Sequence, residues 1–338
     1  MKIDLRSDTV TKPTKEMLEF MMQAKVGDDV FGEDETVKKL EERLANMFGK
    51  EKALFFPSGT MANQTAIKLH TNPGEQVICD KYGHIYNYES GGVAFNSGVS
   101  CKLLDGQRGM FTLNQVKEAI NPLDYWYAQT SLVAVENTTN KGGGACWDFN
   151  ELIKIKKVCL ENKLGYHLDG ARLWNALVAK KENPKQYGEI FDTISVCFSK
   201  GLGAPIGSVL VGDADIMKNA IRIRKVFGGN LRQAGYLAAA ALYALDNHVD
   251  RLVGDHKKAR EIGEVLTQKP QIKSVEPIET NIIIFELNDD VSEQVFFQRL
   301  VDRGIHIISM GSNKLRMVTH LNYTNDMHTA VLKALKGL

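Results

Sequence analysis

Long hydrophobic runs are missing from this sequence. No stretch approaches the roughly 20 apolar residues that a membrane-spanning helix needs. Neither sign of charge dominates, because 42 lysines and arginines face 41 aspartates and glutamates. Because the charges nearly cancel, the protein has no strong electrostatic field that would attract nucleic acid or an anionic membrane. The first residues, MKIDLRSDTVTK, are charged and lack the apolar segment of a signal peptide. We therefore expect a cytoplasmic protein that binds neither membranes nor nucleic acid.

Cysteine is scarce, and its spacing excludes two further classes of protein. The five cysteines are widely spaced, odd in number and form no CxxC pair: Cys79, Cys101, Cys146, Cys159 and Cys197. We expect reduced, mostly buried thiols rather than a disulfide framework or a zinc site. The eight histidines show no HxxxH or similar ligand spacing, so no catalytic metal is expected.

Internal repeats and low-complexity segments are also absent, whereas strand-like and helix-like segments alternate through the first two-thirds of the chain. This alternation predicts an α/β architecture with a mainly parallel sheet. An early helix is expected from Thr36, with apolar residues at helical spacing and Gly49 at its end. The segment 234–245, rich in Ala and Leu, predicts a buried helix. The short apolar segments expected as strands are 53–56, 76–79, 131–135, 165–168 and 193–198.

The pattern changes beyond about residue 247. A charged helical stretch precedes a predicted strand, an amphipathic helix, two short strands and a final helix, at 281–287, 291–303, 306–310, 315–319 and 325–336. This order indicates a small α+β domain with an antiparallel sheet. We therefore expect an N-terminal arm (1–25), a large cofactor-binding domain (26–246) and a small C-terminal domain (247–338).

The segment TISVCFSKGLG, residues 193–203, places Lys200 after an apolar strand and before glycines. Low-dielectric surroundings at the mouth of a buried strand favour the neutral, nucleophilic form of a lysine amine. Glycines on its far side allow a flat ring to approach the backbone. A solvated turn lysine is the alternative for this segment alone. A dinucleotide-binding loop is disfavoured, since the glycine spacing is wrong and Pro205 would disrupt the start of a helix.

Two other strand ends carry groups that suit pyridoxal phosphate (PLP). Asp169, in GYHLDGAR, ends an apolar strand and could pair with a protonated pyridine nitrogen. In PSGTMAN, Ser58 or Thr60 could cap a helix whose free amides bind a phosphate, with Gly59 leaving room. The alternatives are an Asp–Gly turn and an ordinary helix cap.

His84 follows a further apolar strand, where an imidazole could stack on the pyridine ring and act as a base. An ordinary loop histidine is the alternative. The phosphate site, the carboxylate of Asp169 and the amine of Lys200 all follow the carboxyl ends of expected parallel strands. Ligands of such sheets bind at this edge. The combination therefore predicts a PLP site.

Seven motifs are spread over nearly the full chain, from Met1 to about His320: IDLRSDTVTKPT, GDDVFGEDETV, FFPSGTMANQTA, LDGARLWNA, FSKGLGAPIGSVLVGD, GGNLRQAG and LRMVTH. Together they resemble the threonine aldolase group of the β-eliminating lyases. The resemblance implies a fold-type-I PLP enzyme that assembles as a homodimer or homotetramer with active sites shared between subunits.

The resemblance also implies how residues contact the cofactor. Lys200 would form the Schiff base, Asp169 would pair with the pyridinium nitrogen and His84 would stack on the ring. The other residues implied to contact the cofactor or its phosphate are Ser58, Gly59, Thr60, Arg172, Lys225 and Arg232. Lys225 and Arg232 would come from a neighbouring subunit, and a solvated basic helix face is their alternative.

For the substrate, the resemblance implies a carboxylate site made by Ser7, Arg172 and Arg316. A planar guanidinium fork is well shaped for a carboxylate. Trp126 departs from the family, which commonly has a histidine there that contacts the substrate hydroxyl. We expect Trp126 to replace that contact with an apolar wall. A surface loop outside the site is the alternative.

Two further departures concern Thr139, in place of the histidine of the family's NTHN stretch, and Phe31, in place of a common tyrosine. Both leave the expected cofactor residues unchanged and bear on the choice of substrate.

The expected activity is cleavage of a β-hydroxy-α-amino acid, L-threonine or L-allo-threonine, to glycine and an aldehyde. One alternative keeps PLP but changes the reaction to β-elimination or racemisation. A second alternative is a non-catalytic PLP-binding regulatory protein, which the even charge and the lack of a DNA-binding domain disfavour. A third is a cofactor-free aldolase that uses Lys200 alone, which the expected phosphate site disfavours.

Overall fold

A seven-stranded sheet forms the centre of the large domain. The computed structural model describes residues 1–338 and orders these strands β2-β8-β7-β6-β5-β3-β4. Only β8 runs antiparallel to its neighbours, so β2 points in the same direction as β7. The strands are β2 (Lys52–Phe56), β3 (Gln76–Asp80), β4 (Ser100–Leu104), β5 (Thr130–Glu136), β6 (Gly165–Gly170), β7 (Thr193–Cys197) and β8 (Ser208–Gly212).

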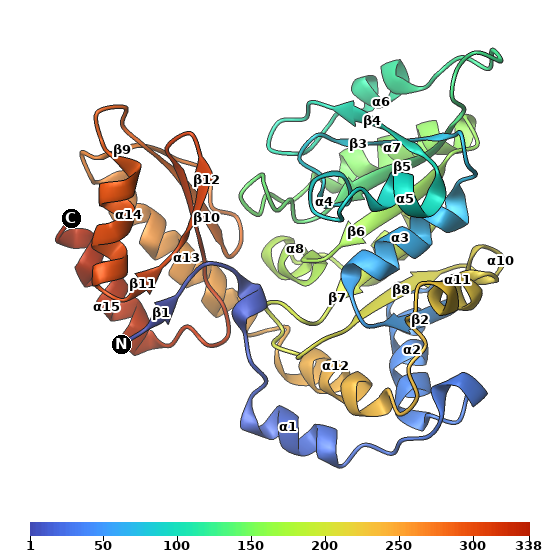
Figure 1. The fold of residues 1–338 in the computed structure, drawn as a ribbon, viewed down its shortest axis with the longest axis horizontal. Helices are drawn as coiled ribbons and strands as arrows, with labels where there is room; N and C mark the ends of the chain where they lie inside the picture. Colours follow the sequence, from blue (N-terminus) through green and yellow to red (C-terminus); the bar gives the residue numbers. More distant parts are fainter.

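Helices cover both faces of this sheet (Figure 1). A core of 45 buried residues lies between the strands and these helices. The helices are α1 (Lys15–Met22), α2 (Glu35–Phe48), α3 (Gly59–His70), α4 (His84–Asn87), α5 (Gly92–Ser97), α6 (Leu113–Ala119), α7 (Phe149–Glu161), α8 (Leu173–Lys180), α9 (Pro184–Ile190), α10 (Ala214–Met217), α11 (Ala220–Val226) and α12 (Gly235–Asn247). Two short 3-10 helices lie at Asp8–Val10 and Asp29–Phe31.

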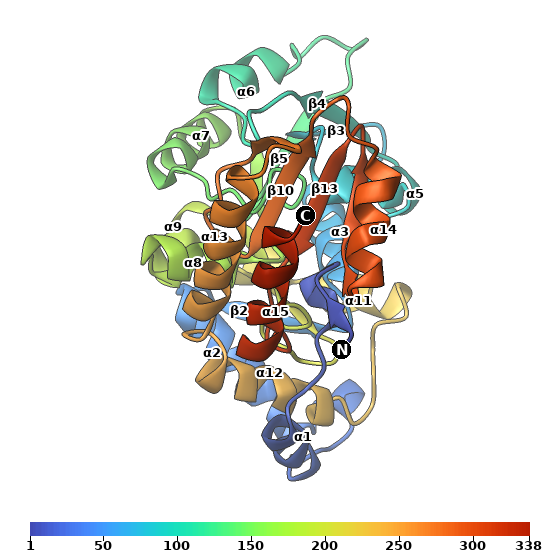
Figure 2. The same ribbon diagram turned by 90° about the vertical axis from the view of Figure 1, so that its left-hand side faces the viewer.

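The small domain is an antiparallel sheet of order β12-β13-β10-β9 with three helices on one face (Figure 2). Its own core contains 18 buried residues. Its elements are α13 (Leu252–Thr267), β9 (Ile272–Val275), β10 (Ile282–Leu287), α14 (Glu293–Asp302), β11 (Ile305–His306), β12 (Ile308–Gly311), β13 (Lys314–Val318) and α15 (Asn325–Lys336).

The N-terminal arm contacts both domains. Its strand β1 (Ile3–Asp4) pairs in parallel with β11, and Ile3 and Leu5 belong to the core of the small domain. The following helix α1 packs against α12 of the large domain, where the Phe20 and Tyr243 rings lie 5.8 Å apart. The chain therefore crosses the junction between the domains at the short helix that begins with Asp8.

The structure confirms the expected fold class. Every expected strand of the large domain is present, and the early helix ends at Gly49, whose φ of 64° suits a residue without a side chain. The expected boundary near residue 246 lies close to the end of α12 and stays a prediction. The edge strand β4 is an addition to the expected set, and β8 runs antiparallel to its neighbours. All five cysteines are free, and no helix is long and apolar enough to cross a membrane.

A carboxyl group between α2 and β2 sets one pH dependence of stability. Glu41 accepts a hydrogen bond from the Phe55 amide at 2.8 Å, and burial raises the pKa of Glu41 from 4.5 to about 7. The folded state therefore holds a proton that the unfolded chain releases. Its contribution to stability is complete below pH 4.5 and is lost as the pH rises through about 7.

We expect Glu41→Gln to stabilise the protein more at pH 8 than at pH 5, because glutamine has no charge to desolvate. The gain in unfolding free energy at pH 8 should be on the order of 1 to 3 kcal/mol. Denaturant unfolding at several pH values measures it, and Glu42→Gln on the exposed neighbour is the control. A stability difference that is the same at pH 5 and pH 8 would contradict the role of Glu41.

Candidate active site

Strand register brings several predicted residues to one edge of the large sheet. Glu136 lies opposite Asp169, which lies opposite Ser195 on β7. Phe56 and Cys197, at the ends of β2 and β7, both lie opposite Ser208 of β8. The carboxyl ends of β2, β5, β6 and β7 therefore meet at the same edge, where α/β sheets bind ligands.

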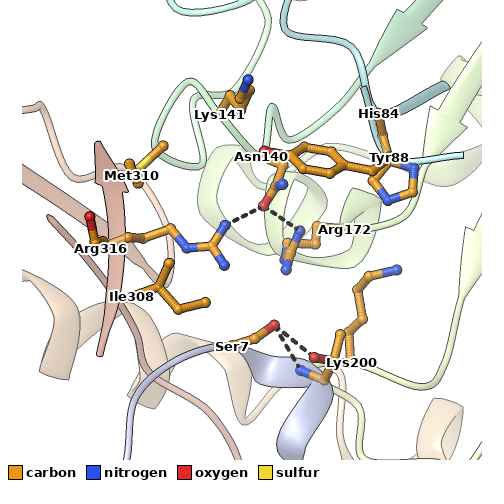
Figure 3. A pocket seen from close by; sticks show the side chains of 12 residues that line it. Ser7, His84, Tyr88, Asn140, Lys141, Arg172, Lys200, Ile308, Met310 and Arg316 are labelled. Carbon is orange, nitrogen blue, oxygen red and sulfur yellow. Dashed lines mark hydrogen bonds between the residues drawn. The ribbon is translucent and has the colours of Figure 1, made fainter. Parts of the chain in front are cut away.

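A cavity of about 520 Å³ opens at this edge, between the large domain and strands β12 and β13 of the small domain (Figure 3). It takes residues from the N-terminal arm, from loops of the large domain and from the small domain. Its lining residues are Ser7, Thr9, His84, Tyr88, Asn140, Lys141, Arg172, Lys200, Ile308, Ser309, Met310 and Arg316.

Lys200 follows β7 by three residues, and its side chain extends into the cavity (Figure 3). Its backbone is fixed, since its carbonyl oxygen accepts from Thr11 Oγ1 and from the Gly203 amide, each at 2.9 Å. Gly203 has a φ of 77°, a value that favours glycine. A tight loop thus presents the amine to the cavity, as expected for a lysine at the mouth of a buried strand.

Asp169 lies beneath this cavity, buried at the end of β6. Asn63 Nδ2 donates to Asp169 Oδ2 and to Glu89 Oε1, at 2.9 Å each. The amide of Asn63 is held in this orientation because its oxygen accepts from Ser195 Oγ at 2.7 Å. The Ala171 amide donates to the other Asp169 oxygen at 3.1 Å. The carboxylate is therefore fixed by donors on both oxygens.

His84 lines the cavity and is oriented from below by Glu89, with 2.9 Å between Nδ1 and Oε1. Burial alone would lower the pKa of His84, but the bond to Glu89 and the charges of Asp169 and Glu136 raise it above its usual value. The ligand-type atoms of His84, Glu89 and Asp169 lie within 4.8 Å of one another. Because Asn63 and His84 already contact these carboxylates, the cluster is an oriented acid–imidazole group.

Glu136 is buried beside Asp169 and accepts from the backbone amides of His84 and Asn140, at 2.8 Å each. Burial, reinforced by the charge of Asp169, raises the pKa of Glu136. Glu136 therefore joins the loop that carries His84 to the loop that carries Asn140.

The residues expected to bind a phosphate begin α3. Ser58 Oγ accepts from the Met61 amide at 3.2 Å, while the amides of Gly59 and Thr60 have no partner in the chain. A Cβ atom at Gly59 would lie 2.7 Å from Cys197 Sγ, so this close approach to the end of β7 requires glycine. None of the three residues lines the cavity that contains Lys200.

The two expected carboxylate-binding arginines meet in the cavity. Arg172 pairs with buried Asp8 through Nε and Nη2 at 2.9 and 2.7 Å. Burial alone would raise the pKa of Asp8, but the Arg172 guanidinium lowers this pKa to about 2. Arg172 Nη1 and Arg316 Nη1 both donate to Asn140 Oδ1, at 3.3 and 3.0 Å. Ser7, the third expected residue, lines the same cavity.

Three expected site residues lie elsewhere within one chain. Trp126 is 62% exposed on the loop between α6 and β5 and does not line the cavity. Lys225 is exposed near the end of α11, and exposed Arg232 pairs with Asp28 at 3.0 Å. Within a single chain, Trp126 therefore lies on a surface loop outside the site. Lys225 and Arg232 lie on a solvated surface. Any contact with an active site would have to be made in another subunit.

Sequence reasoning missed the residues that support the site, namely Asp8, Asn63, Tyr88, Glu89, Glu136 and Asn140. Asp8 adjoins Ser7, Asn63 ends the PSGTMAN motif and Asn140 ends NTTN, so three of them lie in motifs that were already noticed. Tyr88 and Glu89 follow closely after His84, and Glu136 directly follows the expected strand 131–135, but none of the three carries a more specific signal.

The charges and donors of the site fit PLP. Below the cavity, three buried carboxyl groups (Glu89, Glu136 and Asp169) face one imidazole, so a protonated pyridine nitrogen would supply a missing positive charge. The unpartnered amides at the start of α3 suit a phosphate. The Lys200 amine suits an aldehyde carbon.

Comparisons with known proteins agree with this fit. The model of the β-eliminating lyase family matches residues 4–290. The chain is 39% identical to low-specificity L-threonine aldolase 1 of Arabidopsis thaliana, over 96% of this chain and 93% of that protein. It is also 39% identical to the low specificity L-threonine aldolase of Escherichia coli K12, over 96% and 95%. A solved threonine aldolase of Leishmania major has the same fold, with a TM-score of 0.86 at 21% identity over 99% of both chains.

Fold and site together define a PLP-dependent enzyme of fold type I. Within this class, the chain belongs to the β-eliminating lyase family, whose model covers most of its length. The roles of the individual site residues stay predictions.

Proposed function

We propose that the protein cleaves a β-hydroxy-α-amino acid, L-threonine or L-allo-threonine, to glycine and an aldehyde. The cavity carries this proposal, because the amine of Lys200 and the guanidinium groups of Arg172 and Arg316 line one space. An amino acid bound there would place its carboxylate at the arginines and its amine toward the cofactor site. The names of the Arabidopsis and E. coli relatives agree with this substrate class.

Four features of the chain would hold the cofactor. Lys200 would bind PLP through its amine, Asp169 would pair with the ring nitrogen, His84 would cover the ring and the first turn of α3 would bind the phosphate. When bound, PLP supplies an electron sink that stabilises negative charge on the amino-acid Cα.

The arginines retain donors for a substrate carboxylate. A guanidinium has five N–H groups, and Arg172 uses three of them on Asp8 and Asn140. Asp8 occupies only one edge of the Arg172 fork, so both Nη atoms keep an N–H for an incoming carboxylate. With Arg316, these donors would orient the bond between Cα and Cβ for cleavage.

Proton transfer is assigned to His84. Its Nδ1 faces Glu89, so Nε2 is the atom that can accept a proton. We propose that Nε2, or a water bound to it, takes the β-hydroxyl proton as the bond between Cα and Cβ breaks. The β-carbon then leaves as the carbonyl carbon of the aldehyde, and Cα takes up a proton to give glycine.

The test is product analysis with L-threonine and L-allo-threonine, with PLP present and after its removal. Equal amounts of acetaldehyde and glycine, formed only with PLP, are the expected result. Products formed equally well without PLP would point to an aldolase that uses Lys200 alone. Absence of any turnover, with PLP bound, would point to a non-catalytic protein.

β-Elimination is the second candidate, because the family model is described by that reaction. Elimination of water from threonine would release 2-oxobutanoate and ammonia instead of acetaldehyde and glycine. The same product analysis separates the two reactions, and 2-oxobutanoate as the main product would overturn our proposal.

We expect Arg316→Lys to raise the Michaelis constant for threonine roughly 10-fold with little effect on kcat, because one ammonium cannot replace a bidentate fork. Arg316 also donates to Asn140 Oδ1 and to the Arg6 carbonyl, and lysine cannot reach both. Initial-rate kinetics measure the effect, and the cofactor absorbance should stay the same. An unchanged Michaelis constant would place Arg316 outside the carboxylate site.

We also propose a cytoplasmic homodimer or homotetramer with shared active sites. Free cysteines agree with a reducing compartment. Several large apolar side chains remain exposed in the single chain, including Phe31 (75%), Phe95 (90%) and Val226 (79%). An interface over these residues would bury them. Sedimentation of the active enzyme as a monomer would contradict the shared sites.

A further inference from the structure

Asn140 occupies the centre of the cavity's positively charged end. Its side-chain oxygen accepts from Arg316 Nη1 at 3.0 Å and from Arg172 Nη1 at 3.3 Å, and Figure 3 shows it between the two guanidinium groups. Its backbone amide is fixed by Glu136 Oε1 at 2.8 Å. Asn140 lines the cavity, and its side-chain nitrogen donates to no group of the chain. Asn140 thus contacts both arginines and keeps two free donors.

The charges around Asn140 do not cancel. Asp8 neutralises Arg172 and also accepts from Asn281 Nδ2 at 3.2 Å. Arg316 has no carboxylate partner: its Nη2 donates to the Arg6 carbonyl at 3.2 Å and its Nε has no partner. Burial and the charge of Arg172 both lower the pKa of Arg316. Arg316 therefore contributes a positive charge that no carboxylate partner neutralises, and the groups that orient it are neutral.

We propose that Asn140 is a specificity-determining residue that selects amines carrying a carboxylate. Its neutral oxygen orients Arg172 and Arg316 without cancelling their charge, and its free NH₂ group donates to the bound substrate. The inference rests on the proposed function, since it takes the ligand to be an α-amino acid.

An isosteric substitution separates this role from simple packing. Aspartate has nearly the same shape as asparagine and would bind both arginines more strongly. Its negative charge would neutralise the site and repel a substrate carboxylate. If the substrate carboxylate binds away from Asn140, the added charge should leave its binding nearly unchanged.

The experiment uses the PLP-loaded enzyme and compares two ligands by calorimetry. Glycine carries the carboxylate, and 1-amino-2-propanol is threonine without it. Asn140→Asp should weaken glycine binding about 10- to 100-fold and leave 1-amino-2-propanol binding unchanged or tighter. The charge-matched control is Asn150→Asp on the exposed surface of α7, which should bind both ligands as the wild type does.

Asn140→Ala provides a second measurement that does not depend on the stability of the aspartate variant. It removes the oxygen that orients both guanidinium groups but keeps their charge. Glycine binding should weaken by about 3- to 10-fold, less than for aspartate. Wild-type glycine affinity in either variant, or an equal loss for both ligands in Asn140→Asp, would overturn the proposal.

Failure of the proposed function gives a different result. If the wild type binds glycine but releases no aldehyde from threonine, the aldolase activity is wrong. The ratio of the two dissociation constants in Asn140→Asp would still test the selection of a carboxylate by Asn140.

Discussion

Lys200→Ala is expected to lower turnover by at least ~10³-fold, because it removes the only amine that the cavity presents next to the end of β7. The fold should be retained. The hydrogen bonds that fix this loop, from Thr11 and Gly203, go to the backbone carbonyl of residue 200, which alanine keeps. Borohydride reduction followed by peptide mass analysis locates the lysine that carries the cofactor.

Lys141 provides the control, because its amine belongs to the same cavity lining and lies 5.5 Å from the centre of the Tyr88 ring. Lys141→Ala should still give the reduced adduct on Lys200, whereas Lys200→Ala should give none. An adduct found on Lys141 or on any other lysine would show that Lys200 is assigned wrongly.

Asp169→Asn is expected to reduce turnover by roughly 10²- to 10³-fold while much of the cofactor stays bound. The substitution keeps the volume of the side chain and an oxygen for Asn63 or Ala171, but removes the charge that would stabilise a protonated ring nitrogen. Because that stabilisation is greatest when negative charge develops on the amino acid, kcat should fall much more than cofactor affinity. Steady-state kinetics and cofactor titration measure the two effects.

Glu89→Gln is the matched comparison, since Glu89 is equally buried and shares the Asn63 amide with Asp169. Its carboxylate faces His84, so its loss should alter the pH profile of activity more than the rate at the optimum. Near-normal turnover in Asp169→Asn would mean that Asp169 does not pair with the ring nitrogen.

The central residues of the site could be predicted because their signals are local. An apolar strand followed by a polar residue and glycine marks the carboxyl end of a parallel strand, and parallel strands bring such ends to one edge. Lys200 and Asp169 both carry this signal, and the register of β5, β6 and β7 brings the ends of their strands to the same edge. The antiparallel direction of β8 was not expected, because a short apolar sequence does not encode the direction of its strand.

The supporting contacts could not be predicted, because they join residues that are far apart in the chain. Asp8 and Arg172 are separated by 164 positions, and Asn63 and Asp169 by 106. No periodicity or composition signals that a given carboxylate will meet a given amide across such a distance. Trp126 shows the opposite limit. The family resemblance suggested that it contacts the substrate, but within one chain it does not line the cavity.

The pairing of β1 with β11 has a consequence for the order of events during synthesis. Ile3 is synthesised well before its partner Ile305, because the whole large domain lies between them in the chain. Domains that fold during synthesis begin with the N-terminal segments that are already available. The large domain, complete at α12, can form while the first five residues are still unpaired. The hydrophobic side chains of Ile3 and Leu5 must stay exposed, or be held by a chaperone, until most of the small domain has been made. Strand β1 therefore pairs only after its partner β11, on the far side of the large domain in sequence, has been made.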